Sequence, residues 1–147
     1  MTSAPDDDAE TMLAASRGLL GLVVRSLAPA LKSVRIEDYR VLELLASRGD
    51  LEVRDLAEFT GMSALRVDES LRRLSAGGRI AMRGTTGTIT PGGHALVDEV
   101  THRRRAEIAR LISSLSSDDR GRVREALVLI TEAAGEPPPE QLLTLGL

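Results

Sequence analysis

The sequence predicts a mainly α-helical fold with one short β-hairpin. Apolar residues recur at intervals of three and four over most of the chain, as amphipathic helices require. This pattern is interrupted at residues 79–90, where two β-prone runs flank glycines. A chain of 147 residues is long enough for one core, because at about 150 residues roughly 68–70% of the unfolded surface becomes buried. We therefore expect a single domain over residues 9–135.

The first predicted helix spans residues 9–31. Its apolar side is wider than one neighbouring helix would cover, and consists of Met12, Leu13, Leu19, Leu20, Val23, Val24, Leu27 and Leu31. Residues 1–8 are acidic and are expected to be disordered, whereas a signal peptide needs positive charge there. No apolar stretch approaches the ~20 residues of a membrane span, so we expect a cytoplasmic protein with no membrane partner.

Three shorter helices should follow, over residues 36–47, 53–59 and 63–76. The first of them is closed by Gly49, and glycine commonly ends helices. Ser63 is suited to cap the third, because a serine side chain accepts a hydrogen bond from the first helical turn. Gly77 and Gly78 end that helix.

The hairpin and two long helices complete the domain. Residues 79–83 and 88–90 flank the loop Gly84-Thr85-Thr86-Gly87, which predicts a small β-hairpin. Thr90 and Pro91 then suit a cap followed by proline at the first helical position. The two helices should span about 92–115 and 117–134, and the Pro-rich tail, residues 136–147, should be extended.

The composition excludes several classes of site. The chain has no cysteine, so disulfides, thiolate catalysis and cysteine-based metal sites are excluded. Its basic residues are eighteen arginines and one lysine, Lys32, which does not lie in a phosphate-binding loop. No pairing of a nucleophile with a base is visible. We expect neither an enzyme nor a cofactor.

Charge is distributed unevenly along the chain. The formal net charge is −3, yet residues 62–110 hold nine basic and five acidic side chains, and the segments on both sides are acidic. A basic segment of this kind is typical of a nucleic-acid footprint. A solvated helix face would explain the charge equally well.

A helix-turn-helix motif coincides with the basic segment. Ala57, Gly61 and Val67 stand at the first, fifth and eleventh positions of the motif. A small residue is needed where two helices cross, a glycine where the turn requires positive φ, and an apolar residue to anchor the second helix. Because the hairpin follows directly, residues 36–92 predict a winged helix-turn-helix.

Several further segments resemble the MarR family of bacterial transcriptional regulators. They are Tyr39-Arg40-Val41-Leu42, Leu56-Ala57, Gly61-Met62-Ser63, Val67, Leu71-Arg72-Arg73-Leu74, Gly78, Arg83 and Thr90-Pro91-Gly92-Gly93-His94-Ala95-Leu96. The resemblance implies a homodimer held by helices 9–31, 92–115 and 117–134. It also implies a recognition helix in the major groove of double-stranded DNA, and a small-molecule effector. We therefore expect a repressor of a palindromic operator.

Nine residues are the candidates for DNA contact: Ser63, Arg66, Glu69, Arg72, Arg73, Arg79, Arg83, Thr85 and Thr86. Arg66 and Arg73 are expected nearest the bases. Glu69 stands in the middle of the face opposite the core, where the family more often has polar or basic residues. It could accept a hydrogen bond from a cytosine amine, pair with Arg66 or Arg73 within the helix, or repel phosphates. The intrahelical pair is favoured for the free protein.

The predicted wing is shorter than MarR wings usually are. It has no acidic residue and no arginine at its tip, so Arg83 and the threonine hydroxyls are expected to contact phosphates rather than the minor groove. This departure, with Glu69, supports an alternative function. The chain would then be a ligand- or protein-binding dimer that kept the scaffold with weak or lost DNA binding.

The remaining polar residues give weaker predictions. Arg17, Tyr39 and His94 are candidates for lining an effector cleft. His94, Asp98 and His102 recur every four residues and could hold a metal ion, but an ordinary polar face is favoured because no further ligand completes the set. The run 103–105 consists of arginines and could contact DNA backbone or an acidic effector. A solvated edge, or pairing across the dimer, is favoured.

Overall fold

The computed structural model describes residues 4–135, and it confirms the mainly helical fold. Its elements are, in order, α1 (Ala4–Leu27), a 3-10 helix η1 (Ala30–Lys32), α2 (Ile36–Arg48), β1 (Leu51–Glu52), α3 (Val53–Thr60), α4 (Ala64–Ala76), β2 (Ile80–Arg83), β3 (Thr86–Ile89), α5 (Pro91–Ser113) and α6 (Ser117–Ala134). The predicted tail, 136–147, lies outside the described residues. Within them, no helix is long and apolar enough to cross a membrane.

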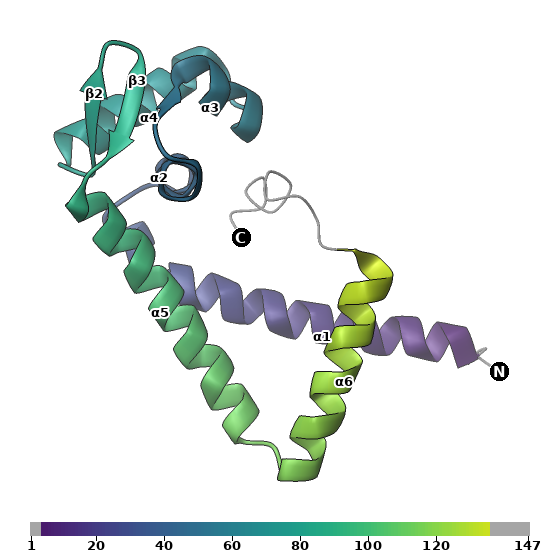
Figure 1. Ribbon diagram of the computed structural model, residues 1–147. Helices are drawn as coiled ribbons and strands as arrows, with labels where there is room; N and C mark the ends of the chain where they lie inside the picture. Colours follow the sequence, from purple (N-terminus) through teal and green to yellow (C-terminus); the bar gives the residue numbers. More distant parts are fainter. Residues whose placement is uncertain (1–3, 136–147) are drawn as a thin grey trace.

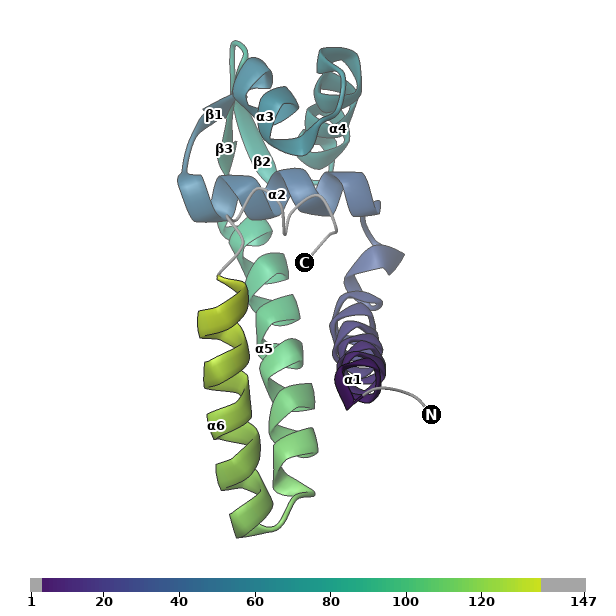
Figure 2. The ribbon, with the colours of Figure 1, turned by 90° about the vertical axis from the view of Figure 1, so that its right-hand side faces the viewer.

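The elements form a head, which contains the sheet, and a second part made of the long helices α1, α5 and α6 (Figure 1). The head consists of α2, α3, α4 and the sheet, and α5 leads away from it. Helix α6 turns back from the far end of α5. In Figure 2, α1 lies on one side of α5 and α6 on the other, and α2 lies between α4 and the long helices.

The N-terminal helix differs from its predicted bounds at both ends. It begins at Ala4, so the expectation of disorder is wrong for residues 4–8. Asp6 and Asp7 stand in its first turn, where the helix dipole favours acidic side chains. The α-helix ends at Leu27 rather than at residue 31, because Pro29 has no N–H with which to continue the hydrogen-bond ladder. The 3-10 helix η1 covers most of the remainder.

The sheet has a third strand that the sequence pattern did not predict. The order is β1-β3-β2 and all pairs are antiparallel. Strand β1 is only two residues long, too short to show an alternating pattern, and Leu51 pairs with Gly87. The wing turn is Gly84-Thr85 alone, with φ of 62° at Gly84, and Thr86 lies in β3.

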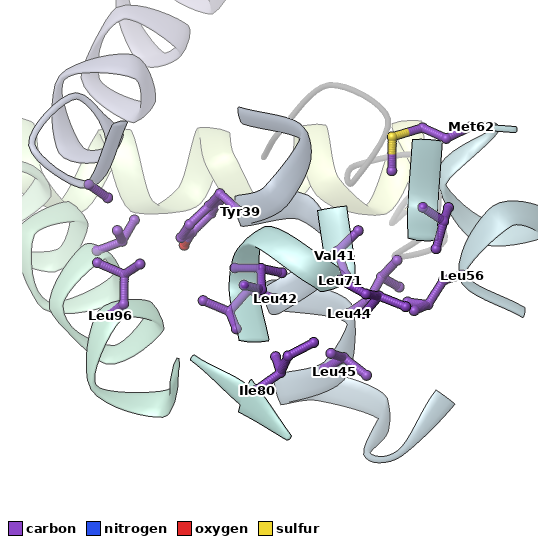
Figure 3. Packing of buried hydrophobic residues seen from close by; sticks show 14 of the residues in the cluster. Tyr39, Val41, Leu42, Leu44, Leu45, Leu56, Met62, Leu71, Ile80 and Leu96 are labelled. Atoms are coloured by element: carbon purple, nitrogen blue, oxygen red, sulfur yellow. The ribbon is translucent and has the colours of Figure 1, made fainter. Parts of the chain in front are cut away.

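The core is built around α2 and extends into α5. Tyr39 and Leu42 of α2 are buried together with Val67 and Leu71 of α4 and Leu96 of α5. Figure 3 shows Tyr39 and Leu96 at one end of this cluster, with Leu56 and Met62 at the other. One continuous core therefore fixes the position of α4 relative to α5.

Helix α6 contributes nothing to this core. None of its residues is buried, and four consecutive apolar side chains on it, Leu127, Val128, Leu129 and Ile130, are exposed. In proteins, most helical stability comes from packing of an apolar face against a neighbour. Within the described residues of the single chain, nothing buries these apolar side chains of α6.

Candidate nucleic-acid interface

The turn that leads into α4 has the geometry that the sequence predicts. Gly61 ends α3 in the left-handed conformation, with φ of 69° and ψ of 9°. Ser63 caps α4, its hydroxyl accepting a hydrogen bond from the backbone N–H of Arg66 at 3.3 Å. Arg40 Nη2 of α2 donates to the Thr60 carbonyl oxygen at 3.1 Å. These contacts determine where α4 begins and how it is oriented.

Helix α4 is amphipathic, and its two sides are clearly distinct. Val67, Leu71 and Leu74 are buried against the core. On the opposite side, Leu65 and Glu69 are exposed. This outward side is the surface that a helix-turn-helix protein inserts into the major groove.

Arg73 points toward α2 rather than toward the open side of α4. Its guanidinium donates two hydrogen bonds to Asp38, from Nε to Oδ2 at 2.9 Å and from Nη2 to Oδ1 at 2.7 Å. The Asp38 side chain is only 5% exposed, whereas that of Arg73 is 34% exposed. The hydrogen bonds to Asp38 raise the pKa of Arg73. This contact orients α4 on α2, and the prediction that Arg73 reads bases stays untested.

The other two arginines of α4 are also paired with carboxylates. Arg66 Nη2 donates to Glu37 of α2. Arg72 donates through both Nε and Nη2 to Asp68, one turn earlier on the same helix. Both pairs are exposed, and exposed ion pairs contribute only about 0–1 kcal/mol. Arg66 and Arg72 therefore remain available for exchange onto another anion.

The intrahelical pair favoured for Glu69 is not formed. Its two prospective partners, Arg66 and Arg73, turn to Glu37 and Asp38 of α2. Among residues 4–135 the structure shows no hydrogen bond or ion pair from the Glu69 carboxylate, which is exposed. The sequence pattern could not show this, because the competing acids lie about 30 residues away in the chain.

The candidate residues in and next to the wing lie in different environments. Arg83 is exposed at the end of β2, opposite Thr86 in the register. Thr85 is exposed in the turn, and its backbone oxygen accepts a hydrogen bond from Val53 N–H at 3.1 Å. Arg79, in contrast, donates from Nη1 to the Gly92 carbonyl oxygen at 2.8 Å. Arg79 thus joins the base of the wing to α5.

The three effector candidates do not share one environment. Tyr39 is fully buried, whereas Arg17 on α1 and His94 on α5 are exposed. The histidines, His94 and His102, are both exposed on α5. Within residues 4–135, no three His, Cys, Asp or Glu side chains are grouped so as to hold a metal ion.

A buried polar cluster around Tyr39 was missed by the sequence reasoning. It comprises Ser26 of α1, Tyr39 and Glu43 of α2, and Arg104 of α5. Arg104 Nε donates to Ser26 Oγ at 3.3 Å, while the Tyr39 hydroxyl, Glu43 Oε2 and Arg104 Nη2 are buried without hydrogen-bond partners. Arg104 follows the buried residues Leu96 and Val100 at intervals of four, a spacing that could have revealed its burial.

Burial also perturbs the titration of this cluster. The pKa of Glu43 is raised, chiefly because burial penalises its charged form, while Arg104 and the Tyr39 hydroxyl act in the opposite direction. The pKa of Tyr39 is raised by burial and by the nearby Glu43 carboxylate. Of the flanking arginines, Arg103 pairs with Glu99 on the surface at 2.6 Å. The run 103–105 is therefore not a uniform solvated edge.

Comparison with solved structures identifies the fold. The RV1404 protein of Mycobacterium tuberculosis superposes with a TM-score of 0.74 and 27% identity, covering 92% of this chain and 98% of that one. A MarR family protein from Bacillus stearothermophilus gives 0.67 and 17%, covering 92% and 100%. The M. tuberculosis MarR family protein Rv2887, in complex with DNA, gives 0.59 and 23%, covering 86% and 97%.

Sequence comparison alone finds less. No protein-family model matches the chain, and no curated protein matches its sequence. The structural likeness nevertheless extends over nearly the whole length of each neighbour, and includes the long helices as well as the winged head. The chain has the winged helix-turn-helix fold of the MarR family of transcriptional regulators.

Proposed function

We propose that this chain is a transcriptional regulator that binds double-stranded DNA through α4 and the wing. The observation that carries the proposal is that the outward side of α4 is exposed. The helix itself is capped by Ser63 and held against α2 by the contact between Arg73 and Asp38. A neighbour with the same fold has been solved in complex with DNA. Exposed hydroxyls and arginines flank this side of α4.

Phosphate contacts are assigned to the exposed groups. Ser63, Arg66, Arg72, Arg83 and Thr85 are the proposed set, together with Thr86, which is half-buried in β3. Arg66 and Arg72 would exchange Glu37 and Asp68 for phosphate, since exposed pairs hold them only weakly. Arg73 and Arg79 act as positioning residues, because their guanidinium groups are directed to Asp38 and to the Gly92 carbonyl.

The proposed regulator is a homodimer. The accessible surface of the chain is 9603 Å², whereas a compact monomer of 15.8 kDa should expose about 7,300 Å². Exposed apolar side chains lie on α1, α5 and α6, and a groove of about 750 Å³ lies between these helices. A two-fold axis would then place two recognition helices roughly 34 Å apart on a palindromic operator. Bound there, the dimer would repress transcription.

A small-molecule effector is proposed to act where α1, α2 and α5 meet. Support comes from the buried polar atoms of Tyr39, Glu43 and Arg104 that have no partner in this structure. Such atoms are costly unless hydrogen-bonded. A polar molecule that stabilises the wild type against heat but not an Arg104→Gln variant would locate the site there.

The DNA-binding proposal is tested by a mobility-shift assay with the upstream region of the chain's own gene. We expect a shift at about 50 mM salt that weakens steeply at about 200 mM, as phosphate contacts require. No shift at low salt, from a folded dimer, would support the alternative of a ligand- or protein-binding module. The pairing of Arg66, Arg72 and Arg73 with acids is the observation that favours that alternative.

The wing is tested by Arg83→Ala, with Arg122→Ala on α6 as the matched exposed control. If Arg83 contacts a phosphate, its removal should weaken binding to all sequences alike and reduce the salt slope by about one. The Arg122 side chain is 82% exposed, and its loss should leave both quantities unchanged. An unchanged slope in Arg83→Ala would remove the wing arginine from the interface.

A further inference from the structure

Two side chains dominate the outward side of α4 once the arginine contacts are taken into account. Leu65 is 64% exposed. Glu69 follows one turn later, exposed and without a hydrogen-bond partner within residues 4–135. In Figure 2 α4 lies at the outer side of the head, with α2 between it and the long helices, so those helices do not cover this side.

Arginine is the residue that most often contacts guanine, and in this structure each arginine of α4 is paired with a carboxylate. That contact needs both donors of one guanidinium aimed at guanine O6 and N7. Arg73 already directs two donors to the buried Asp38, and removing either partner of a buried pair is strongly destabilising. Arg72 directs Nε and Nη2 to Asp68. Guanine readout by Arg73 would therefore begin by breaking a buried contact, whereas Arg66 and Arg72 would give up only exposed pairs.

A carboxylate and an apolar side chain read other bases. A glutamate accepts a hydrogen bond from the N4 amine of cytosine, and apolar side chains contact the methyl group of thymine. Leu65 and Glu69 both lie in the first half of α4, from which helix-turn-helix proteins contact base edges. Four residues of helix rise about 6 Å, close to two steps of 3.4 Å along a DNA strand.

We propose that Glu69 reads a cytosine amine and Leu65 a thymine methyl, so that each operator half-site holds the two bases within about two steps of one another. This inference rests on the proposed DNA-binding function and specifies its sequence preference. The flanking Arg66 and Arg72 offset the repulsion between Glu69 and phosphates. Specificity then resides in Leu65 and Glu69, and the arginines supply orientation and affinity.

The test is a selection from a pool of randomised duplex DNA, using the full chain and two variants. The wild type should enrich half-sites with the predicted cytosine and thymine. Glu69→Gln should replace cytosine by adenine at that position, because glutamine bonds adenine N6 and N7, with a change in preference of roughly 5- to 150-fold. Glu132→Gln, an exposed change on α6, is the control and should enrich the wild-type sites.

The leucine contact has its own probe. Replacing the selected thymine by uracil removes only the methyl group, and should weaken binding several-fold for the wild type but not for Leu65→Ala. Leu65→Ala should keep the cytosine preference and lose that for thymine. An equal uracil effect in both proteins would overturn the role of Leu65.

The possible outcomes distinguish a failure of this inference from a failure of the proposed DNA-binding function. If the wild type enriches a sequence and Glu69→Gln enriches the same bases, DNA binding stands and the inference is wrong. If the folded wild type enriches no sequence at low salt and gives no mobility shift, the proposed function fails, and the inference fails with it.

Discussion

At the scale of single residues, acids from α2 bind two of the three arginines of α4, Arg66 and Arg73. Asp38 lies on the same side of α2 as Val41, Leu42 and Leu45, so it is carried into the core with them. A buried carboxylate needs a partner, and Arg73 supplies one from α4. One of the two arginines that the sequence analysis expects nearest to the bases therefore holds α4 on α2.

Removing the contact between Arg73 and Asp38 should lower the free energy of unfolding. Arg73→Ala leaves Asp38 buried and unpaired, and we expect a loss of about 2 kcal/mol in the free energy of unfolding, since Arg73 is partly exposed. A double-mutant cycle with Asp38→Ala, measured by urea unfolding, should give clear coupling between the two residues. Arg72→Ala, which breaks an exposed pair, should change stability by less than about 0.5 kcal/mol. Equal losses in both single arginine variants would contradict this assignment.

Glu43 predicts a pH dependence of stability. Because burial raises its pKa in the folded state, the folded protein holds this proton more tightly than the unfolded chain does. The contribution of Glu43 is then fully present below the unfolded pKa of about 4.3 and is lost as pH rises through the folded value. The unfolding free energy of the wild type minus that of Glu43→Gln should fall over this range. A difference that is flat or rises with pH would refute the prediction.

At the scale of elements, the start of α5 packs closely against the sheet. Gly93 lies where α5 approaches the sheet, and a Cβ there would stand 2.2 Å from the Arg79 carbonyl oxygen and 2.7 Å from Ile89 Cγ1. Thr90 caps the same helix, its hydroxyl accepting from Gly93 N–H at 3.2 Å and donating to the Gly78 carbonyl at 2.7 Å. Only a glycine fits this position without displacing the wing.

This close packing is tested with two glycine-to-alanine changes in helices. Gly93→Ala should destabilise the protein by about 1–3 kcal/mol through overpacking and should weaken DNA binding by displacing the wing. Gly121→Ala lies in α6 with nothing within 4 Å of the added methyl. It should stabilise the protein by roughly 0.5–1 kcal/mol. Thermal unfolding of the two variants side by side compares these opposite signs, and stabilisation by Gly93→Ala would disprove the close packing.

At the scale of the whole molecule, the single chain leaves apolar side chains of the long helices α1, α5 and α6 exposed. Val123, Leu127 and Ile130 follow one another at helical spacing on α6, yet no residue of this helix is buried. Leu127 lines the groove between α1, α5 and α6. A second copy of the chain would cover this apolar surface, as the proposed homodimer requires.

The dimer is tested by a charged substitution on each end of the molecule. Leu127→Glu places a carboxylate in the proposed interface and should convert the dimer to a monomer in analytical ultracentrifugation. Leu65→Glu is the control, since Leu65 is an exposed leucine on α4, outside the long helices. It should remain dimeric. A wild type that sediments as a monomer, or a dimeric Leu127→Glu variant, would contradict the proposed interface.

The sequence by itself determined the elements and their order. Helical periodicity, the caps at Ser63 and Thr90, the positive φ at Gly61 and the hairpin all depend on interactions within a few residues, and local patterns report such interactions directly. The same reasoning placed α4 and its exposed side correctly. It failed at β1, where two residues carry no pattern.

Only the tertiary structure decided which charged side chains remain exposed. The partners Asp38 and Arg73 lie 35 residues apart, and Ser26 and Arg104 lie 78 apart, so nothing in their local sequence pairs them. Each pair forms because packing of α2 against α4, or of α1 against α5, brings polar groups into a low-dielectric interior where they must find partners. The contacts that withdraw Arg73 and expose Glu69 therefore arise from the fold and not from the pattern of α4.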